Sequence, residues 1–420
     1  MKDFFCGNRK KISETLKDGT AVVLFAGSAP VKRGDEKYPF SPDRNFYYFT
    51  GLDNQNLIYT AYKADGEFSE CLFLERNDPV AAKWTGAVIG EEEAETKSGI
   101  SEFKFIDEFE VFFSGIVFSK GIEKIYLDLE NREMKHFTPA FDFAGKIRAN
   151  YPYMAIENCY NFFAELRRIK QPYEIEQIKK AIDITKEGFL LMMRNAGAGM
   201  YEYEIEAYFD FAVKKRGAAD FAFKTIAASG KNAAILHYSE NRSITRDGDL
   251  ILIDAGAQSG YYSGDITRTF PVNGKFTERQ KVIYDIVLRG QKMIIESIRP
   301  GVPFKSLNEK LREFYLEELK KIGFIEKGGT IDDVSEYYYH NVSHTLGLET
   351  HDAGRYKEGL LKPGMVMTVE PGLYIEKEEI GIRIEDDILV TENGCEVLSK
   401  DIIKEISDIE EYMGGLNEYT

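Results

Sequence analysis

Short apolar runs separated by charged residues characterise the first part of the chain, up to about residue 160. The runs AVVLFAG, NFYYFTG, LIYTAYK, ECLFLER and KIYLDL have the length and composition of strands. We therefore predict a small α/β domain over residues 1–160. We expect its boundary in the segment FFAELRRIKQPYEIEQ, where a helical period begins.

The pattern of residues 161–420 predicts two helices and then a pair of strands, with the same order repeated. Pro172 is suited to the first turn of a helix, and the apolar residues after it follow a period of 3.6 until the segment NAGAG. A second helix is expected over 204–216. The capping boxes TERQ and SLNE predict two further helices, which end at Pro300 and Gly323. This repeat indicates a pseudo-symmetric α/β domain.

Acidic residues occur inside both predicted strand pairs. Asp254 ends the apolar run LILI, and a turn centred on Ser259 and Gly260 would place Asp254 opposite Asp265. A turn centred on 377–378 would likewise place Glu370 opposite Glu385, and Arg383 shares a strand face with Glu385. Buried carboxylates require positive partners, and four of them can hold two divalent ions.

Histidines occur in the same part of the chain. Four of the five, His237, His340, His344 and His351, lie beyond residue 230. A nitrogen ligand among oxygen ligands suits Mn(II), Co(II), Zn(II) or Fe(II) better than Mg(II) or Ca(II). Each residue taken alone is more simply interpreted as a surface charge or a buried structural group. Their joint occurrence favours a metal site.

The composition restricts the partners. A chain of 420 residues with 43% hydrophobic residues is expected to form two domains, and a net charge of -16 disfavours binding to nucleic acid or to an anionic membrane. The four cysteines show no CxxC spacing, and no apolar run of about 18 residues occurs. We expect a cytoplasmic protein with reduced thiols.

Several segments resemble the pita-bread dinuclear metallopeptidases, and most closely the Xaa-Pro aminopeptidases (aminopeptidase P). They are LHY at 236–238, IDAGAQSGYYSGDITRTFPVNGKF, SHTLGLETHD, TVEPGLY and GIRIEDD. The segment YPFSPDRNFYYFTGL resembles the amino-terminal domain of those enzymes. The resemblance implies a mixed α/β (α+β) fold. An aminopeptidase P-type α/β domain (1–160) would precede a pita-bread catalytic domain (161–420).

The resemblance also implies individual roles. The metal ligands would be Asp254, Asp265, His344, Glu370 and Glu385, with Asp265 and Glu385 bridging both ions. Glu370, His237, His351 and Arg383 would take part in catalysis, and His237, His340, His351 and Tyr374 would contact the substrate. Trp84 and Asp35 resemble residues that approach a neighbouring subunit's active site in tetrameric relatives.

The implied activity is the metal-dependent release of the N-terminal residue from peptides with proline second. A hydroxide bridging two ions, expected to be Mn(II) with Co(II), Zn(II) or Fe(II) as alternatives, would attack the Xaa-Pro bond. The expected partners are such peptides and further copies of the chain in a dimer or tetramer. An Xaa-Pro dipeptidase (prolidase) is the nearest alternative. The complete ligand set disfavours a non-catalytic peptide-binding or chaperone-like module and a metal-free creatinase-like hydrolase.

Overall fold

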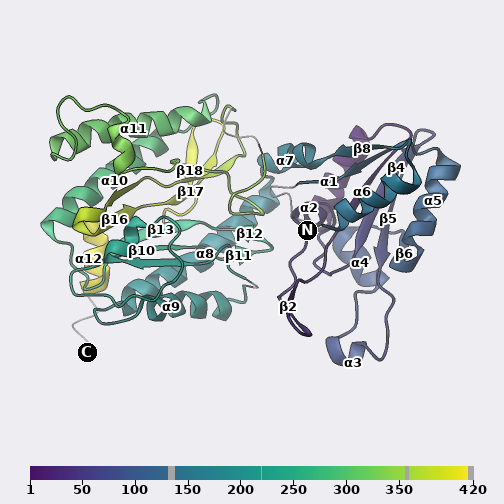
Figure 1. The fold of residues 1–420 in the computed structure, drawn as a ribbon, viewed down its shortest axis with the longest axis horizontal. Helices are drawn as coiled ribbons and strands as arrows, with labels where there is room; N and C mark the ends of the chain where they lie inside the picture. The colour runs from purple at the N-terminus through teal and green to yellow at the C-terminus, as the bar shows by residue number, and fades with distance from the viewer. Residues whose placement is uncertain (131–137, 219, 355–358, 415–420) are drawn as a thin grey trace. The chain divides into compact units, whose positions relative to one another are not determined.

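A computed structural model describes residues 1–130, 138–218, 220–354 and 359–414. The chain divides into two compact units, Met1–Ala164 and Glu165–Thr420 (Figure 1). The division falls within helix α7 (Tyr160–Arg168), which also contains the expected boundary between residues 160 and 161. No helix among the described residues is long and apolar enough to cross a lipid bilayer.

The first unit is a mixed α/β structure around one sheet. Its elements in chain order are α1 (Lys2–Thr15), β1 (Thr20–Phe25), β2 (Val31–Arg33), β3 (Glu36–Lys37), α2 (Arg44–Thr50), β4 (Ile58–Ala64), β5 (Glu67–Leu74), α3 (Ala82–Thr85), α4 (Glu91–Ser98), β6 (Phe103–Phe105), η1 (Ile106–Glu108), α5 (Phe109–Lys120), β7 (Lys124–Leu127), α6 (Pro139–Asn150) and β8 (Ala155–Asn158). The sheet has the order β6-β5-β4-β1-β7-β8. Apolar residues of α5 and α6 pack on it to form a core.

Four of the five runs predicted as strands in this unit are confirmed, in β1, β4, β5 and β7, but the prediction for NFYYFTG is wrong. This segment forms α2, because the Asp43 carboxylate caps the helix by accepting the backbone N–H of Phe46 at 2.8 Å. Gly51 ends the helix with a left-handed φ of 69°. Nearly all side chains of this short helix are buried, so its sequence does not alternate between apolar and polar residues with the helical period of 3.6.

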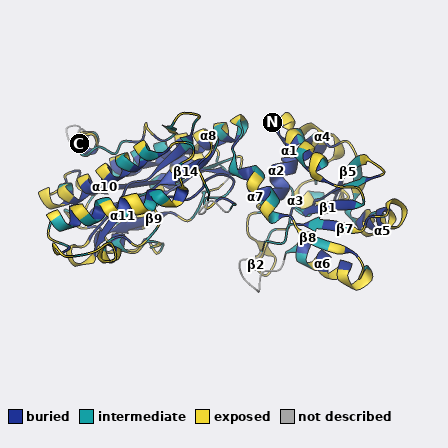
Figure 2. Ribbon diagram, turned by 90° about the horizontal axis from the view of Figure 1, so that it is seen from above, coloured by how far each residue is buried: buried dark blue, intermediate teal, exposed yellow. Residues whose placement is uncertain are grey.

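The second unit shows the predicted repeat of helices and strands. Its elements are α8 (Pro172–Asn195), α9 (Glu202–Lys215), β9 (Ile226–Ser229), η2 (Gly230–Ala234), β10 (Leu250–Ala255), β11 (Gln258–Ser259), β12 (Tyr262–Ser263), β13 (Ile266–Pro271), α10 (Glu278–Ser297), α11 (Phe304–Lys321), η3 (Asp333–Glu336), β14 (Val366–Val369), β15 (Gly372–Ile375), η5 (Glu376–Glu378), β16 (Ile380–Arg383), β17 (Asp386–Val390), β18 (Cys395–Val397) and α12 (Ile406–Gly414). The strands lie between α8 and α9 on one side and α10 and α11 on the other (Figure 1). They are largely buried, whereas the helices expose their outer faces (Figure 2).

The structure confirms one of the two predicted capping boxes. Thr277 and Gln280 cap α10 reciprocally, because each side chain accepts the other residue's backbone N–H. The box predicted at SLNE is wrong, since α11 begins earlier, at Phe304. Ser306 lies in its first turn and donates to the carbonyl of Pro303.

The first strand pair has a register different from the predicted one. Asp254 on β10 lies opposite Thr267 on β13, and not opposite Asp265. The tight turn consists of Gly260 and Tyr261, whose φ angles are 53° and 66°. Two positive φ angles are the signature of a type I′ hairpin turn, which matches the twist of its strands. The prediction therefore placed the turn one residue too early.

The second strand pair has the predicted register. Gly372 pairs with Arg383 and Val369 with Asp386, so Glu370 and Glu385 are opposite each other between the two ladders. Each predicted strand is divided in two at its acidic residue.

The backbone N–H groups at the acidic interruptions bond outside the hairpin ladders. Glu370 donates to the carbonyl of Val342 and Glu385 to that of Thr267, at 2.9 and 3.0 Å. Asp265, between β12 and β13, donates to the carboxylate of Asp387 at 3.0 Å. These bonds fix the backbone from which three acidic side chains project.

Candidate metal centre

Three side chains with metal-ligand chemistry converge in the second unit. Asp265, His344 and Glu385 are buried, and one ligand atom from each lies within 4.8 Å of the others. The Nε2 atom of His344 is 3.3 Å from Oδ2 of Asp265 and 4.0 Å from Oε1 of Glu385. Glu370 belongs to the same group, because its Oε1 lies 3.7 Å from that Nε2. The interruptions in both strand pairs thus bring their acids to one imidazole.

Asp254 completes this group from strand β10. Its Oδ2 accepts a hydrogen bond from Nη2 of Arg383 at 2.6 Å. Its Oδ1 is buried and receives no hydrogen bond from the described residues. An orphaned carboxylate oxygen in a buried site is costly unless a cation or a donor compensates it. Asp254 therefore fits a cation site.

Hydrogen bonding prepares His344 as a nitrogen ligand. Its Nδ1 lies 3.1 Å from the carbonyl oxygen of Thr345, which can only accept, so Nδ1 carries the proton. The lone pair is then on Nε2, which faces the carboxylates. The structure thus provides one imidazole nitrogen and several carboxylate oxygens, a donor set that suits a divalent transition metal.

The electrostatics of the acids favour a cation. Burial, followed by the charges of neighbouring carboxylates, holds the pKa values of Asp265 and Glu385 well above their usual range. Burial also raises the pKa of Glu370 to about 7. A bound divalent cation would reverse this penalty, because it attracts the charged forms of all three.

Arg383 and Thr267 hold the acids in place. The Arg383 guanidinium donates to Asp254, to the Thr267 hydroxyl at 3.0 Å and to the Tyr374 hydroxyl at 3.1 Å. Thr267 in turn donates to Oε2 of Glu385 at 2.6 Å. Thr267 was not among the predicted site residues, although it lies two residues after Asp265 in DITRTF and its side chain is therefore expected on the same face of the strand.

The other predicted histidines surround this cluster in different ways. The His351 ring lies edge-on to the His344 ring, with 4.4 Å between centroids, and is exposed. Nε2 of His340 lies 2.9 Å from the Tyr374 hydroxyl, and burial lowers the pKa of His340 to about 3, so the ring is neutral. His237 is exposed on the loop after η2.

Two predicted residues belong to the first unit. Trp84 lies in α3 with 86% of its surface exposed, and Asp35 is exposed between β2 and β3. Their proposed approach to a neighbouring subunit stays a prediction.

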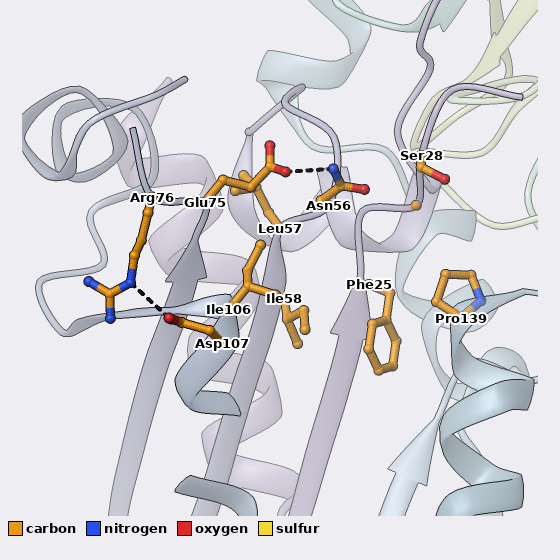
Figure 3. Close-up of a pocket in the computed structure, with 11 residues that line it drawn as sticks. Phe25, Ser28, Asn56, Leu57, Ile58, Glu75, Arg76, Ile106, Asp107 and Pro139 are labelled. Carbon is orange, nitrogen blue, oxygen red and sulfur yellow. Dashed lines mark hydrogen bonds and ion pairs between the residues drawn. The ribbon is translucent and has the colours of Figure 1, made fainter. Parts of the chain in front are cut away.

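The first unit also contains a cavity of about 630 Å³ (Figure 3). Apolar residues such as Phe25 and Ile58 line much of it. Its charged groups are engaged in local contacts: Nε of Arg76 donates to Asp107 at 2.8 Å, and Glu75 accepts from the Asn56 amide at 2.8 Å. The acid cluster of the second unit is thus chemically distinct from this cavity.

Known proteins are similar to this chain over nearly its full length. Residues 176–392 match the model of metallopeptidase family M24, and residues 5–126 match that of the aminopeptidase P N-terminal domain. The Xaa-Pro aminopeptidase of Haemophilus influenzae is 34% identical over 98% of this chain and 97% of its own, and that of Escherichia coli is 33% identical over 97% of each.

Solved structures give the same result. The structure of Escherichia coli aminopeptidase P with the inhibitor Pro-Leu has a TM-score of 0.91 at 32% identity, covering 100% of this chain and 99% of that one. A Bacillus anthracis protein provisionally described as an aminopeptidase P reaches a TM-score of 0.96 at 49% identity, covering 99% of this chain and 98% of that one.

Proposed function

Because this chain belongs to metallopeptidase family M24 and is a metal-dependent aminopeptidase, we propose that it releases the N-terminal residue from peptides with proline in second position. The observation that carries the proposal is the buried cluster of acids around Nε2 of His344, in a chain that matches Xaa-Pro aminopeptidases over nearly its full length. The match of residues 5–126 to the aminopeptidase P N-terminal domain supports the same substrate class.

We assign the metal ligands to the five residues of the cluster. They are Asp254, Asp265, His344, Glu370 and Glu385. Two divalent ions, proposed to be Mn(II) with Co(II), Zn(II) or Fe(II) as alternatives, would supply Lewis acidity that polarises the scissile carbonyl and lowers the pKa of water. The buried, mutually repelling carboxylates and the orphaned Oδ1 of Asp254 support this assignment.

The chain's own residues would move the proton. The Xaa-Pro bond is a tertiary amide without an N–H, so its nitrogen must receive a proton before it leaves as the ring amine. Glu370, whose Oε1 lies 3.7 Å from Nε2 of His344 in the acid cluster, is proposed to accept a proton from the attacking water and deliver it to this nitrogen.

Substrate orientation is assigned to the residues around the acids. Neutral His340 and Tyr374 form one hydrogen-bonded pair, which Arg383 anchors. His237 and His351, both exposed, are proposed to bind the developing oxyanion or the next peptide carbonyl. The dimer or tetramer and the cytoplasmic location stay predictions.

Metal removal is expected to abolish turnover. None of the five side chains of the cluster is a serine, threonine or cysteine, so we expect water activated by a cation to be the nucleophile. Excess chelator should then stop the reaction, and added Mn(II) or Co(II) should restore it. The measurement is peptide turnover before chelation, after it and after metal addition, with metal content determined on each sample. Full turnover in a sample with confirmed metal loss would refute the metal assignment.

A free N-terminal amine and a proline are expected to be required. Acetylation should block cleavage, and changing proline to alanine should slow it, because lost ring contacts are worth roughly 1 to 3 kcal/mol. The assay is a competition among Xaa-Pro-Xaa, its acetylated form and Xaa-Ala-Xaa at equal concentration. An Xaa-Pro dipeptide as fourth substrate separates the aminopeptidase from a dipeptidase, which would prefer it. Comparable cleavage of the acetylated peptide would overturn the aminopeptidase proposal.

A further inference from the structure

A buried carboxylate outside the acid cluster collects five hydrogen bonds. Glu202, the first residue of α9, has 0% of its surface exposed. Its Oε1 accepts from the backbone and hydroxyl of Ser229, both at 2.7 Å, and from the amide of Asn232 at 3.0 Å. Its Oε2 accepts from the Tyr238 hydroxyl at 2.8 Å and from the backbone of Ser243 at 2.9 Å. A carboxylate only accepts, so every one of these donors is oriented toward it.

These donors come from separate segments around His237. Ser229 ends β9, Asn232 lies in η2, and Tyr238 is the residue directly after His237. The loop from 235 to 243 contains no helix or strand, so its shape depends on such contacts. Glu202 therefore connects both ends of this loop to the N-terminus of a helix.

The same loop packs against Tyr374, a residue that contacts Arg383 beside the acid cluster. Tyr374, whose hydroxyl contacts Arg383 and His340, lies in one apolar cluster with Ala233. Leu236 and Tyr238 pack on that cluster. A Cβ atom on Gly381 would come within 2.2 Å of the carbonyl oxygen of Ala233, so β16 leaves η2 no room to shift toward it. Strand β16 thus fixes η2, directly before the loop, and Glu202 fixes the loop itself through Tyr238 and Ser243.

We propose that Glu202 is a positioning residue for substrate binding, which acts through Tyr238 on His237. This inference deepens the proposed function and rests on its assignment of His237 to the substrate. Loss of the Tyr238 hydrogen bond should release the loop and displace His237, while the acids and their contacts stay in place. Substrate affinity should fall and metal content should not change.

The test is a double-mutant cycle with Tyr238→Phe and His237→Ala, measuring KM, kcat, metal content and the binding of the dipeptide Pro-Leu by calorimetry. The Tyr238 hydroxyl donates to a carboxylate, and hydrogen bonds to charged groups are stronger than those between neutral groups. Tyr238→Phe should therefore raise KM and the Kd of Pro-Leu by about tenfold in the wild-type background, with metal content unchanged. In the His237→Ala background the same change should have no further effect. If the Glu202→Gln variant folds, it should show the same rise in KM and in the Kd of Pro-Leu. If it does not fold, the test rests on Tyr238→Phe alone.

The matched control is Tyr59→Phe in the first unit. Tyr59 is buried and donates to Oε2 of Glu70 at 2.8 Å, the same distance as in the Tyr238 bond to Glu202. It should leave KM and Pro-Leu binding unchanged.

Three outcomes would overturn the inference: an unchanged KM in Tyr238→Phe, an effect of equal size when His237 is already alanine, or a fall in metal content that accounts for the loss. If the wild type does not cleave Xaa-Pro peptides yet the cycle on Pro-Leu binding behaves as stated, the proposed function fails and the positioning role of Glu202 remains.

Discussion

Replacement of Glu385 by glutamine is expected to remove more activity than replacement of His351 by alanine. Glu385 is 2% exposed, and its carboxylate lies among Asp265, His344 and Thr267, so the substitution takes a charge from the centre of the site. His351 is exposed and contacts the His344 ring, so its loss leaves the acids in place. We expect a loss of roughly 10- to 100-fold for His351→Ala and a larger one for Glu385→Gln.

The measurement is kcat/KM at matched metal content, with Glu317→Gln on the exposed surface of α11 as a control for the chemical change. Burial and the neighbouring carboxylates raise the pKa of Glu385, so its charge destabilises the metal-free folded protein at neutral pH. In excess chelator, Glu385→Gln should therefore unfold at the same temperature as the wild type or a higher one. Equal residual rates for Glu385→Gln and His351→Ala would contradict this ranking.

Asp352→Asn is expected to destabilise the second unit by about 3 to 5 kcal/mol, the usual cost of breaking a buried ion pair. Asp352 accepts from Arg167 at 2.6 Å and from Lys170 at 2.8 Å, and all three side chains are at most 2% exposed. Burial alone would raise the pKa of Asp352, but Lys170 and Arg167 hold it below its usual range. An asparagine leaves these two buried cations without their shared charge.

Chemical unfolding in excess chelator measures this cost without a contribution from bound metal. The matched control is Glu396→Gln, which removes the exposed pair of Glu396 with Lys179, also 2.8 Å long, and should cost less than about 1 kcal/mol. A loss for Asp352→Asn no larger than that of the control would show that the buried network does not stabilise the unit.

The sequence allowed a better prediction of which acidic residues form the cluster than of the backbone conformation around them. The second hairpin was predictable because the polar run EKEE leaves one place for a turn. The first was not, because its I′ turn uses Tyr261 with a positive φ, a conformation that few non-glycine residues adopt. The acid cluster was predictable from the acidic residues inside the two strand pairs and from the resemblance to the dinuclear metallopeptidases. The spacing in DITRTF gave a local signal for the direction of the Thr267 side chain, but its partner Glu385 is distant in the sequence. No local pattern encodes the contacts of Glu202, whose partners also lie in distant segments.

The interruptions of the strand ladders have an evolutionary consequence. The backbone N–H groups of Asp265, Glu370 and Glu385 are bonded to Asp387, Val342 and Thr267, and substitution of the three acidic side chains alters none of these donors. Under the proposed metal assignment, mutation at these sites would remove metal ligands while the backbone bonds remain. The loss of crowded negative charge would also lower the free-energy cost of that change. A descendant chain could therefore lose these acids and keep the fold, whereas loss of Asp352 would destabilise the fold itself.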